Sequence, residues 1–398
     1  MRLSYNKLIK FDLLDETEAN LTKPECRDNF FEFLKTFQNI ANVNRFIRDC
    51  PSFPDSTQDI IRDELVSAIG STLAIEGVVF KEGEIKEILQ KTDPKELLQR
   101  EQQAVINSRS VYHYITKTID KCKEEFVYKD EHILNIHKTF TENINYIGNK
   151  PGAYRTTGAF FGEPRKASFC GTYTDIYQAM NEYINWLNQK KEGILTGNMI
   201  AKAIMAHYYL AEIHPFGDGN GRTARAVEAM VLYANGVNPY CFWSLANFWS
   251  ANRNEYIFYL GNIRETCNPL DFIIWGAKGY LEQVKRIKDR ILIKVKQLML
   301  QDYVRWLFNN KNRQPPEKKI NQRICDVLFL LTHSGKIPFE KFRSSPAYKS
   351  LYHHTSNMTQ NRDFSKIKSL KLIRISDIDG QMFIEPNYEI LESLQYSV

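Results

Sequence analysis

The sequence predicts a mainly α-helical fold, and three observations carry that prediction. Residues 59–76 place apolar side chains at helical spacing, and Gly77, a residue type that commonly ends a helix, follows them. Residues 196–212 and 222–234 show the same periodicity on either side of a glycine-rich loop. Residues 279–309 form one long amphipathic stretch. Strands are expected only in short hairpins.

The glycine-rich loop between residues 196–212 and 222–234 contains several reactive side chains. Residues 214–225 read HPFGDGNGRTAR, and the glycines lead into a helix N-terminus, where free N–H groups favour an anion. His214 can accept a proton near neutral pH. Asp218 is a hard oxygen ligand suited to Mg²⁺. Arg222 and Arg225 lie three apart on the helix and can make bidentate contacts to a triphosphate.

The other residues of the loop suit the same chemistry. Gly219 and Gly221 allow phosphate to approach the backbone without a Cβ in the way. Asn220 can donate hydrogen bonds to phosphate oxygens. Pro215 and Phe216 are expected to fix the turn and anchor it in the core. The segment is therefore predicted to handle a nucleoside triphosphate.

The whole string matches HPFxDGNGRxxR, so the chain resembles the Fic family. The resemblance implies an enzyme that moves AMP from ATP to a Ser, Thr or Tyr hydroxyl of a target protein. It implies that His214 is the base and that Asp218 holds Mg²⁺ on the α and β phosphates. Asn220 and the backbone of residues 219–221 would form the anion hole. Arg222 would grip the phosphates, and Arg225 would orient the γ-phosphate.

A second motif lies at the end of the helix predicted over residues 59–76. Residues 72–77 read TLAIEG and match the family's inhibitory motif, [S/T]xxxE[G/N], with Thr72 and Glu76 in its fixed positions. The resemblance implies an N-terminal inhibitory helix. If Glu76 reaches Arg225, the carboxylate ties up the guanidinium and repels the γ-phosphate. The enzyme is then expected to be mostly inactive, and the same carboxylate could position water for removal of AMP.

Two further segments fit the resemblance with departures. Residues 152–162 are predicted to form a hairpin flap that holds the target by strand addition, although Ala159, Phe160 and Phe161 replace the usual aliphatic tip. Tyr256, in a segment similar to the family's RxxYY helix, is expected to contact adenine, although Ile257 replaces the second tyrosine. The cofactor-binding residues expected on this basis are Phe161, Gly162, Phe216, Gly217, Asp218, Gly219, Asn220, Gly221, Arg222, Arg225 and Tyr256, with ATP and Mg²⁺ as the cofactors.

Composition limits the class of protein. The 398 residues, 43% of them hydrophobic, can bury a large core, and no apolar run of about 18 residues indicates a membrane span. A cytoplasmic protein is expected, because the N-terminus lacks a secretory signal and the seven scattered cysteines suit a reducing compartment. His207 lies on the same helical face as His214, but no ligand joins the pair, so a buried structural role is expected for His207.

The C-terminal third carries a separate prediction. Residues 285–398 hold 21 Lys and Arg against 11 Asp and Glu, whereas the whole chain has a formal charge of only +6. Helices over 320–333, 339–343 and 350–364, followed by two strands around Asp379-Gly380, resemble a winged helix-turn-helix. Side chains that could face a DNA groove are Lys349, His353, Asn357, Gln360 and Arg362.

The sequence therefore predicts residues 1–100 as a helical region with the inhibitory helix and 101–284 as the Fic catalytic core. Residues 285–316 are the long helix and linker, and 317–398 the winged-helix domain. The favoured function is an autoinhibited protein adenylyltransferase that can also modify itself and can form a homodimer, with no membrane partner and with DNA binding as a less favoured possibility. The alternative is a nucleotide-sensing transcription regulator, or a toxin-type switch, that acts through the winged helix. The intact base His214 favours chemistry over sensing.

Overall fold

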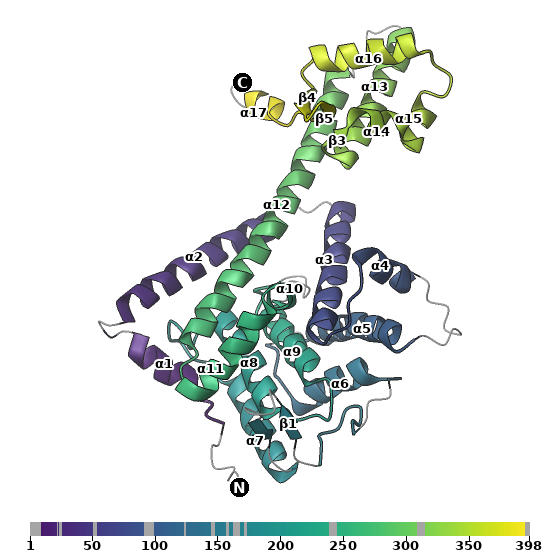
Figure 1. The fold of residues 1–398 in the computed structure, drawn as a ribbon. Helices are drawn as coiled ribbons and strands as arrows, with labels where there is room; N and C mark the ends of the chain where they lie inside the picture. The colour runs from purple at the N-terminus through teal and green to yellow at the C-terminus, as the bar shows by residue number, and fades with distance from the viewer. Residues whose placement is uncertain are drawn as a thin grey trace. The chain divides into compact units, whose positions relative to one another are not determined.

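The computed structural model describes residues 9–21, 23, 26–50, 54–90, 99–122, 125–144, 148–156, 159–161, 168–170, 173–238, 245–308 and 315–394. It is mainly helical, as the sequence predicts (Figure 1). The chain divides into two compact units, Met1–Lys288 and Asp289–Val398. The boundary lies within a single long helix, α12.

The first unit is built from helices with one short hairpin. Its helices are α1 (Leu13–Leu21), α2 (Arg27–Asp49), α3 (Pro54–Ile75), α4 (Glu82–Gln90), α5 (Arg100–Asp120), α6 (Asp130–Thr141), α7 (Tyr173–Asn188), α8 (Met199–Ile213), α9 (Asn220–Ala234), α10 (Ala246–Ala251), α11 (Arg253–Thr266) and the start of α12 (Leu270–Phe308). Its strands are β1 (Ala159–Phe161) and β2 (Ser168–Cys170).

The centre of this unit is the pair α8 and α9, which pack along each other (Figure 1). Both helices are buried over almost their whole length, and Ala201, Ala203 and Ala206 keep the α8 surface small enough for close packing. Helix α3 packs against α9 and α10. The end of α3 is thereby brought to the start of α9, although the two are far apart in sequence.

Two helix starts differ from the prediction. Helix α9 begins at Asn220 because Gly219, with a φ of 77°, takes the left-handed conformation that directs the chain into the helix. Helix α12 begins at Leu270 rather than Gly279. A Cβ on Gly279 would lie 2.2 Å from the Phe248 ring. Gly279 therefore lies in the interior of α12, where the missing side chain leaves room for this ring, and does not mark the start of the helix.

The predicted hairpin over residues 152–162 is displaced along the chain. The observed strands pair antiparallel with Ala159 opposite Cys170 and Phe161 opposite Ser168, so residues 152–162 contain only the first strand. Tyr154 is buried and packs inside the unit, because its hydroxyl donates to Asp130 and its ring lies 5.5 Å from that of Phe216. Gly162 and the side chain of Phe161 lie outside the described residues.

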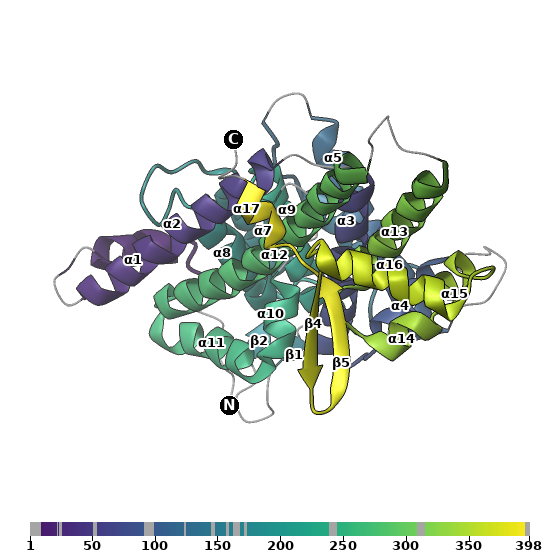
Figure 2. The same cartoon turned by 90° about the horizontal axis from the view of Figure 1, so that it is seen from above.

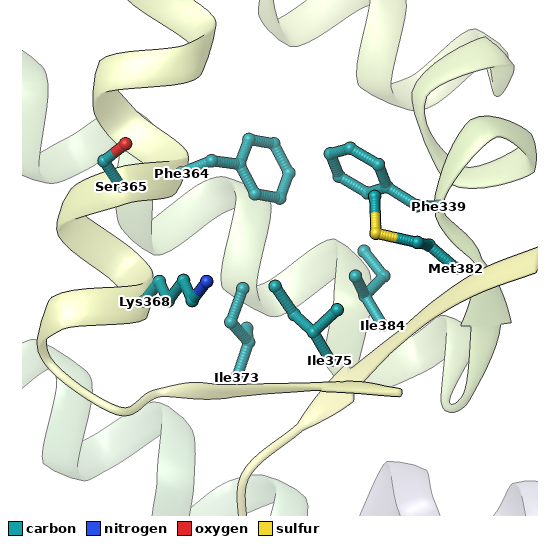
Figure 3. Close-up of a pocket in the computed structure, with 8 residues that line it drawn as sticks. All are labelled: Phe339, Phe364, Ser365, Lys368, Ile373, Ile375, Met382 and Ile384. Carbon is teal, nitrogen blue, oxygen red and sulfur yellow. The ribbon is translucent and has the colours of Figure 1, made fainter. Parts of the chain in front are cut away.

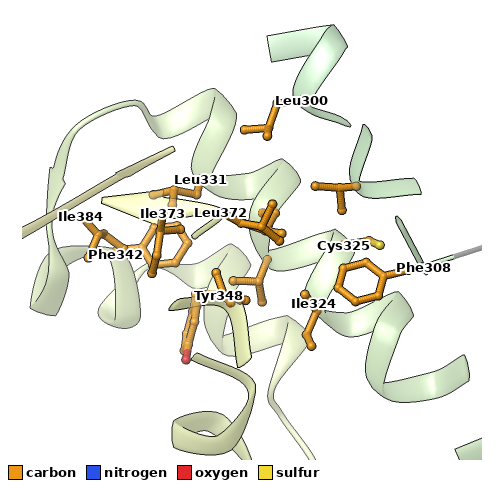
Figure 4. Close-up of a cluster of buried hydrophobic side chains, with 14 of the residues drawn as sticks. Leu300, Phe308, Ile324, Cys325, Leu331, Phe342, Tyr348, Leu372, Ile373 and Ile384 are labelled. Carbon is orange, nitrogen blue, oxygen red and sulfur yellow. The ribbon is translucent and has the colours of Figure 1, made fainter. Parts of the chain in front are cut away.

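The second unit joins helices to a three-stranded sheet. Its remaining elements are α13 (Pro315–Ser334), β3 (Ile337–Pro338), α14 (Phe339–Ser344), α15 (Pro346–Leu351), α16 (Asn357–Ser369), β4 (Ile373–Ile378), β5 (Gln381–Pro386) and α17 (Ile390–Leu394). The strands are antiparallel in the order β3-β5-β4. The end of α12 belongs to the core of this unit, where Leu300 and Val304 are fully buried with Ile324 and Ile384 (Figure 4).

The hairpin predicted around Asp379-Gly380 is confirmed, with φ values of 52° and 78° at the two turn residues (Figure 2). The helix predicted over residues 350–364 is instead two helices, α15 and α16. Ser356 caps α16 by accepting a hydrogen bond from the Thr359 N–H. Gln360 was predicted to face a groove, but its side-chain oxygen accepts from Tyr348 and Arg343 within the unit.

Phe364 lies on α16 and lines a mainly apolar pocket between that helix and the hairpin (Figure 3). The residues lining it are Phe339, Phe364, Ser365, Lys368, Ile373, Ile375, Met382 and Ile384. None of the described helices is both long enough and apolar enough to cross a bilayer. Five cysteines are free thiols in the structure, namely Cys26, Cys50, Cys122, Cys267 and Cys325.

Candidate active site

The loop from α8 to α9 turns on a residue with unusual backbone geometry. His214 ends α8 with a φ of 49°, a left-handed conformation that is uncommon for a non-glycine residue. Arg155 holds this turn, because its Nε donates to the His214 carbonyl at 2.8 Å and its N–H donates to the Pro215 carbonyl at 2.9 Å. Arg155 lies within residues 152–162, which are predicted to form the flap, whereas in the structure it fixes the position of the predicted base.

The environment of the His214 ring sets its protonation. Its Nδ1 lies 3.3 Å from the Ala211 carbonyl, which can only accept, so Nδ1 carries the proton and Nε2 keeps its lone pair. Burial lowers the pKa of His214 to about 4, and the positive charges of Arg155 and Arg264 act in the same direction. The imidazole is therefore neutral at pH 7, the form that a general base needs.

Inside the loop, Asn220 acts as a brace. Its side-chain oxygen accepts from the Phe216 N–H at 2.9 Å, and its amide nitrogen donates to the Phe216 carbonyl at 2.9 Å. The predicted contact of Asn220 with phosphate stays a prediction. Gly217 is required by close packing, because a Cβ there would lie 2.3 Å from the Gly148 carbonyl oxygen.

A second histidine, His137 on α6, packs against the loop and hydrogen-bonds to it. The His137 ring stacks on the buried Phe216 ring with centroids 3.7 Å apart. Its Nδ1 accepts from the Gly152 N–H at 3.1 Å, so Nε2 carries the proton and donates to the Asp218 carbonyl at 3.0 Å. Burial lowers the pKa of His137 to about 4. No sequence pattern identifies His137, because only its partners in the fold distinguish it from any other histidine on a helix.

The acid and the first arginine of the motif lie together at the start of α9. The Asp218 side chain is 40% exposed, accepts from the Gly219 N–H at 2.5 Å and lies 3.5 Å from the Arg222 guanidinium, whose side chain is 5% exposed. An accessible carboxylate beside buried positive charge suits a Mg²⁺ that retains water and phosphate ligands. The residues present therefore fit the predicted metal.

Arg225 is fully buried and faces the end of α3. Its Nε donates to the Thr72 hydroxyl at 2.8 Å, and one terminal nitrogen donates to the Thr72 carbonyl at 3.1 Å and to Glu76 Oε1 at 2.6 Å. Burial disfavours ionisation of Glu76, but the charges of Arg225, Arg222 and Arg253 outweigh it, so the pKa of Glu76 is lowered. The predicted approach of Glu76 to Arg225 is confirmed.

The Glu76 carboxylate also covers the first turn of α9. A Cβ on Gly221 would lie 2.6 Å from Glu76 Oε1 and 3.2 Å from Arg225. Gly221 is therefore a position where the missing side chain leaves room for a carboxylate at a helix N-terminus. That is the place where the sequence predicts an anion.

Tyr256 lies in the core rather than on an open surface. Its side chain is 6% exposed, its ring stacks on Trp249 at 5.4 Å, and its hydroxyl is 2.8 Å from His207 Nε2. The hydroxyl also lies beside the Arg225 guanidinium and interacts with it electrostatically. Contact with adenine stays a prediction. The buried Glu228 next to His207 was missed, although a single acid within the apolar stretch 226–234 is a signal that it needs partners.

The comparisons with known proteins agree with this geometry. Residues 128–232 match the model of the Fic/DOC family. The chain is 28% identical over 182 residues to protein adenylyltransferase fic-1 of Caenorhabditis elegans, covering 45% of this chain and 34% of the relative. It is 26% identical over 235 residues to protein adenylyltransferase Fic of Aedes aegypti, covering 54% of this chain and 43% of the relative. The chain thus spans less than half the length of these relatives.

Solved structures share the fold. A Fic family protein from Desulfovibrio desulfuricans G20 matches with a TM-score of 0.54 at 14% identity, over 89% of this chain and 96% of that chain. Fic-1 from C. elegans matches with a TM-score of 0.51 at 20% identity, over 69% of this chain and 80% of that chain. The matched segment contains α6, the hairpin, and the α8–loop–α9 unit with its complete motif. This chain therefore carries a Fic domain.

Proposed function

We propose that the protein is a protein adenylyltransferase that moves AMP from ATP to a hydroxyl group of a target protein. The observation that carries the proposal is the α8–loop–α9 unit, in which the predicted base, the predicted metal-binding acid and two buried arginines meet at one helix N-terminus. Matching relatives are named protein adenylyltransferases, which supports the same activity.

His214 would remove the proton of the target hydroxyl. In the reaction the hydroxyl oxygen bonds to the α-phosphorus, the bond from that phosphorus to the bridging oxygen breaks, and pyrophosphate leaves. The proton passes to His214 Nε2, whose lone pair is available because Nδ1 faces the Ala211 carbonyl. Arg155 keeps the ring in place through the His214 carbonyl.

The charged groups at the start of α9 would hold the triphosphate. Arg222 and Arg225 supply permanent positive charge with little exposure to water, where electrostatic contacts are strong. Asp218 would hold Mg²⁺, which neutralises phosphate charge when bound. Transfer of this kind depends mainly on positioning and charge stabilisation, so these residues are sufficient for the chemistry.

The β1–β2 hairpin is our candidate for target binding. A two-stranded sheet has backbone groups at its outer edges that can pair with an extended segment of another protein. Main-chain pairing would align a target hydroxyl while leaving the choice of sequence loose. The same mode would allow a segment of a second copy to be modified.

The contact of α3 with α9 would inhibit the enzyme. Glu76 and Thr72 together use three donor contacts of Arg225, and the Glu76 carboxylate covers the first turn of α9. A γ-phosphate brought to Arg225 would meet this negative charge. ATP would then bind without its reactive phosphorus in line with the target.

The decisive experiment replaces Glu76 with glycine and follows transfer of label from α-phosphate-labelled ATP, with γ-labelled ATP as a parallel reaction. Loss of the ion pair between Glu76 and Arg225 is expected to raise AMP transfer on the order of 100-fold, a coupling of about 2.7 kcal/mol. Mass spectrometry of the purified variant is expected to find added AMP on its own hydroxyls. His214→Ala in the same background is expected to remove most of the signal.

Glu82→Gly is the matched control, because Glu82 is an exposed glutamate in the first turn of α4, near the end of α3. It is expected to leave transfer at the parental rate. If label were incorporated only from γ-labelled ATP, the reaction would be phosphoryl transfer and the proposed adenylyl transfer would be wrong. Equal activity of Glu76→Gly and the parent would remove the inhibitory role of Glu76 while leaving the reaction itself to be judged from the label.

The second unit suits a winged-helix arrangement, which we propose from its order of helices and the β4–β5 hairpin. Lys349 and Arg362 are exposed, whereas Gln360 is engaged within the unit, so the polar face available to DNA is smaller than the sequence suggests. The relatives are named for adenylyl transfer, and a regulator acting through this unit is not favoured.

A further inference from the structure

A chain of hydrogen bonds runs through the core behind Arg225. It joins Tyr256 on α11 through His207 on α8 to Glu228 on α9, three residues after Arg225. The Tyr256 hydroxyl is 2.8 Å from His207 Nε2, and His207 Nδ1 is 2.7 Å from Glu228 Oε2. His207 and Glu228 have no exposed surface, and Tyr256 is 6% exposed. These groups are too deep to touch a target protein.

The direction of each bond follows from the two ends of the chain. The Arg225 guanidinium, which interacts with the Tyr256 hydroxyl, carries only donors, so the Tyr256 O–H is directed at His207 Nε2 and donates to it. His207 Nδ1 then carries the proton and donates to Glu228. Glu228 accepts additionally from Trp249 Nε1 and the Leu245 N–H, both at 3.1 Å, so its carboxylate is satisfied on both oxygens.

Arg225 is therefore held from two sides. On one side it donates to Thr72 and Glu76 at the end of α3. On the other it lies beside the Tyr256 hydroxyl, which is hydrogen-bonded through His207 to the buried Glu228. If α3 releases Arg225, the second side remains to fix the guanidinium and to offset its buried charge.

We propose that Tyr256, His207 and Glu228 are positioning residues, which hold Arg225 in the orientation that receives the terminal phosphate of ATP once Glu76 has withdrawn. The inference rests on the proposed function. In this proposal Tyr256 acts through Arg225 and therefore affects binding of the terminal phosphate. An adenine contact would assign the same residue to the opposite end of the nucleotide.

The test measures binding of ATP and of ADP by titration calorimetry, with Mg²⁺ present. It uses the full chain carrying Glu76→Gly, which frees Arg225, and His214→Ala, which prevents turnover. Adding Tyr256→Phe removes one oxygen and keeps the ring. ATP affinity is expected to fall roughly ten-fold, because the polar group beside the buried Arg225 guanidinium is lost, whereas ADP affinity changes less than about two-fold.

Tyr259→Phe is the matched control, since Tyr259 lies three residues further along α11, and its ring packs against Trp275. It is expected to leave both affinities unchanged. Glu228→Gln is expected to lower ATP affinity in the same way, and the double variant Tyr256→Phe/Glu228→Gln should be no weaker than the weaker single variant. Thermal melting of every variant confirms that it is folded at the temperature of titration.

Equal loss of ATP and ADP affinity in Tyr256→Phe would overturn the proposal in favour of a contact nearer the adenosine. Unchanged affinity for both nucleotides, with or without a lower melting temperature, would overturn it in favour of a purely structural role. Absence of AMP transfer by the Glu76→Gly chain with intact His214 would instead count against the proposed function. The two failures are therefore separate.

Discussion

A carboxylate lies on each of the two sides of Arg225, and the two carboxylates differ greatly in their exposure to solvent. On the α3 side, Glu76 directly follows the last residue of the helix, and its side chain is 38% exposed. On the α8–α11 side, the carboxylate of Glu228 has no exposed surface and accepts three N–H donors. One carboxylate contacts the arginine directly, and the other reaches it through a histidine and a tyrosine.

This difference indicates which contact can be released. Freeing Arg225 from Glu76 requires a short movement at a helix end and lets water reach a carboxylate that is already partly solvated. Breaking the contact of Glu228 would leave several buried donors without acceptors. A regulatory contact therefore suits the first side, and a permanent structural contact suits the second.

The largest expected effect tests the buried side. Glu228→Ala leaves N–H groups of His207, Trp249 and Leu245 without their acceptor, so the free energy of unfolding should fall by roughly 3–5 kcal/mol. Urea unfolding followed by tryptophan fluorescence measures this. Glu76→Ala in the same assay should lose less than about 1 kcal/mol, since Glu76 is partly exposed. Equal losses would erase the distinction between the two sides.

A smaller effect separates charge from contact on the α3 side. Glu76→Gln keeps an acceptor for Arg225 but removes the charge that repels phosphate. AMP transfer should rise roughly ten-fold, which is less than the rise expected for Glu76→Gly. Initial rates at saturating ATP provide the comparison. If the glutamine variant were as active as the glycine variant, repulsion by charge would explain the whole inhibition.

Thr72→Val probes the weaker contact on the same side. It removes the hydroxyl that accepts from Arg225 Nε at 2.8 Å and keeps the shape of a buried side chain. Transfer by the otherwise unaltered chain should rise only about three-fold, in line with one modest hydrogen bond. Thr116→Val on α5, where the hydroxyl donates to the His113 carbonyl of its own helix, serves as the control. A rise in both variants would point to a general loss of rigidity.

The smallest expected effect is that of pH. The pKa of Glu76 is lowered in the fold, so its ion pair is fully present above the ordinary carboxyl pKa of about 4.3 and is lost only as pH falls below that value. His214 has a pKa of about 4, so the base stays neutral over the same range. The ratio of Glu76→Gly to parental activity should therefore be constant from about pH 5.5 to pH 8. A marked rise of parental activity near pH 6 would contradict this prediction and would show that the contact between Glu76 and Arg225 is sensitive to pH.

What the sequence determined by itself was local. The run from His214 to Arg225, the helix ending at Gly77 and the Asp379-Gly380 turn are readable because helical periodicity, helix ends and tight turns depend on neighbours within a few residues. The resemblance to the Fic family added the expectation that Glu76 would meet Arg225. These two residues are 149 positions apart, and only the packing of α3 against α9 brings them to 2.6 Å.

The tertiary structure alone decided which polar groups serve the site from within. Arg155 was expected in the flap, and it fixes the His214 turn. His137 carried no local pattern, and the lone acid Glu228 in an apolar stretch indicated only that partners exist, not which ones. Gly279 was read as a helix start, whereas it leaves room for the ring of Phe248. In each case the residue's use depends on a partner from a distant segment, and the energy of burying a polar or bulky group is set by that partner.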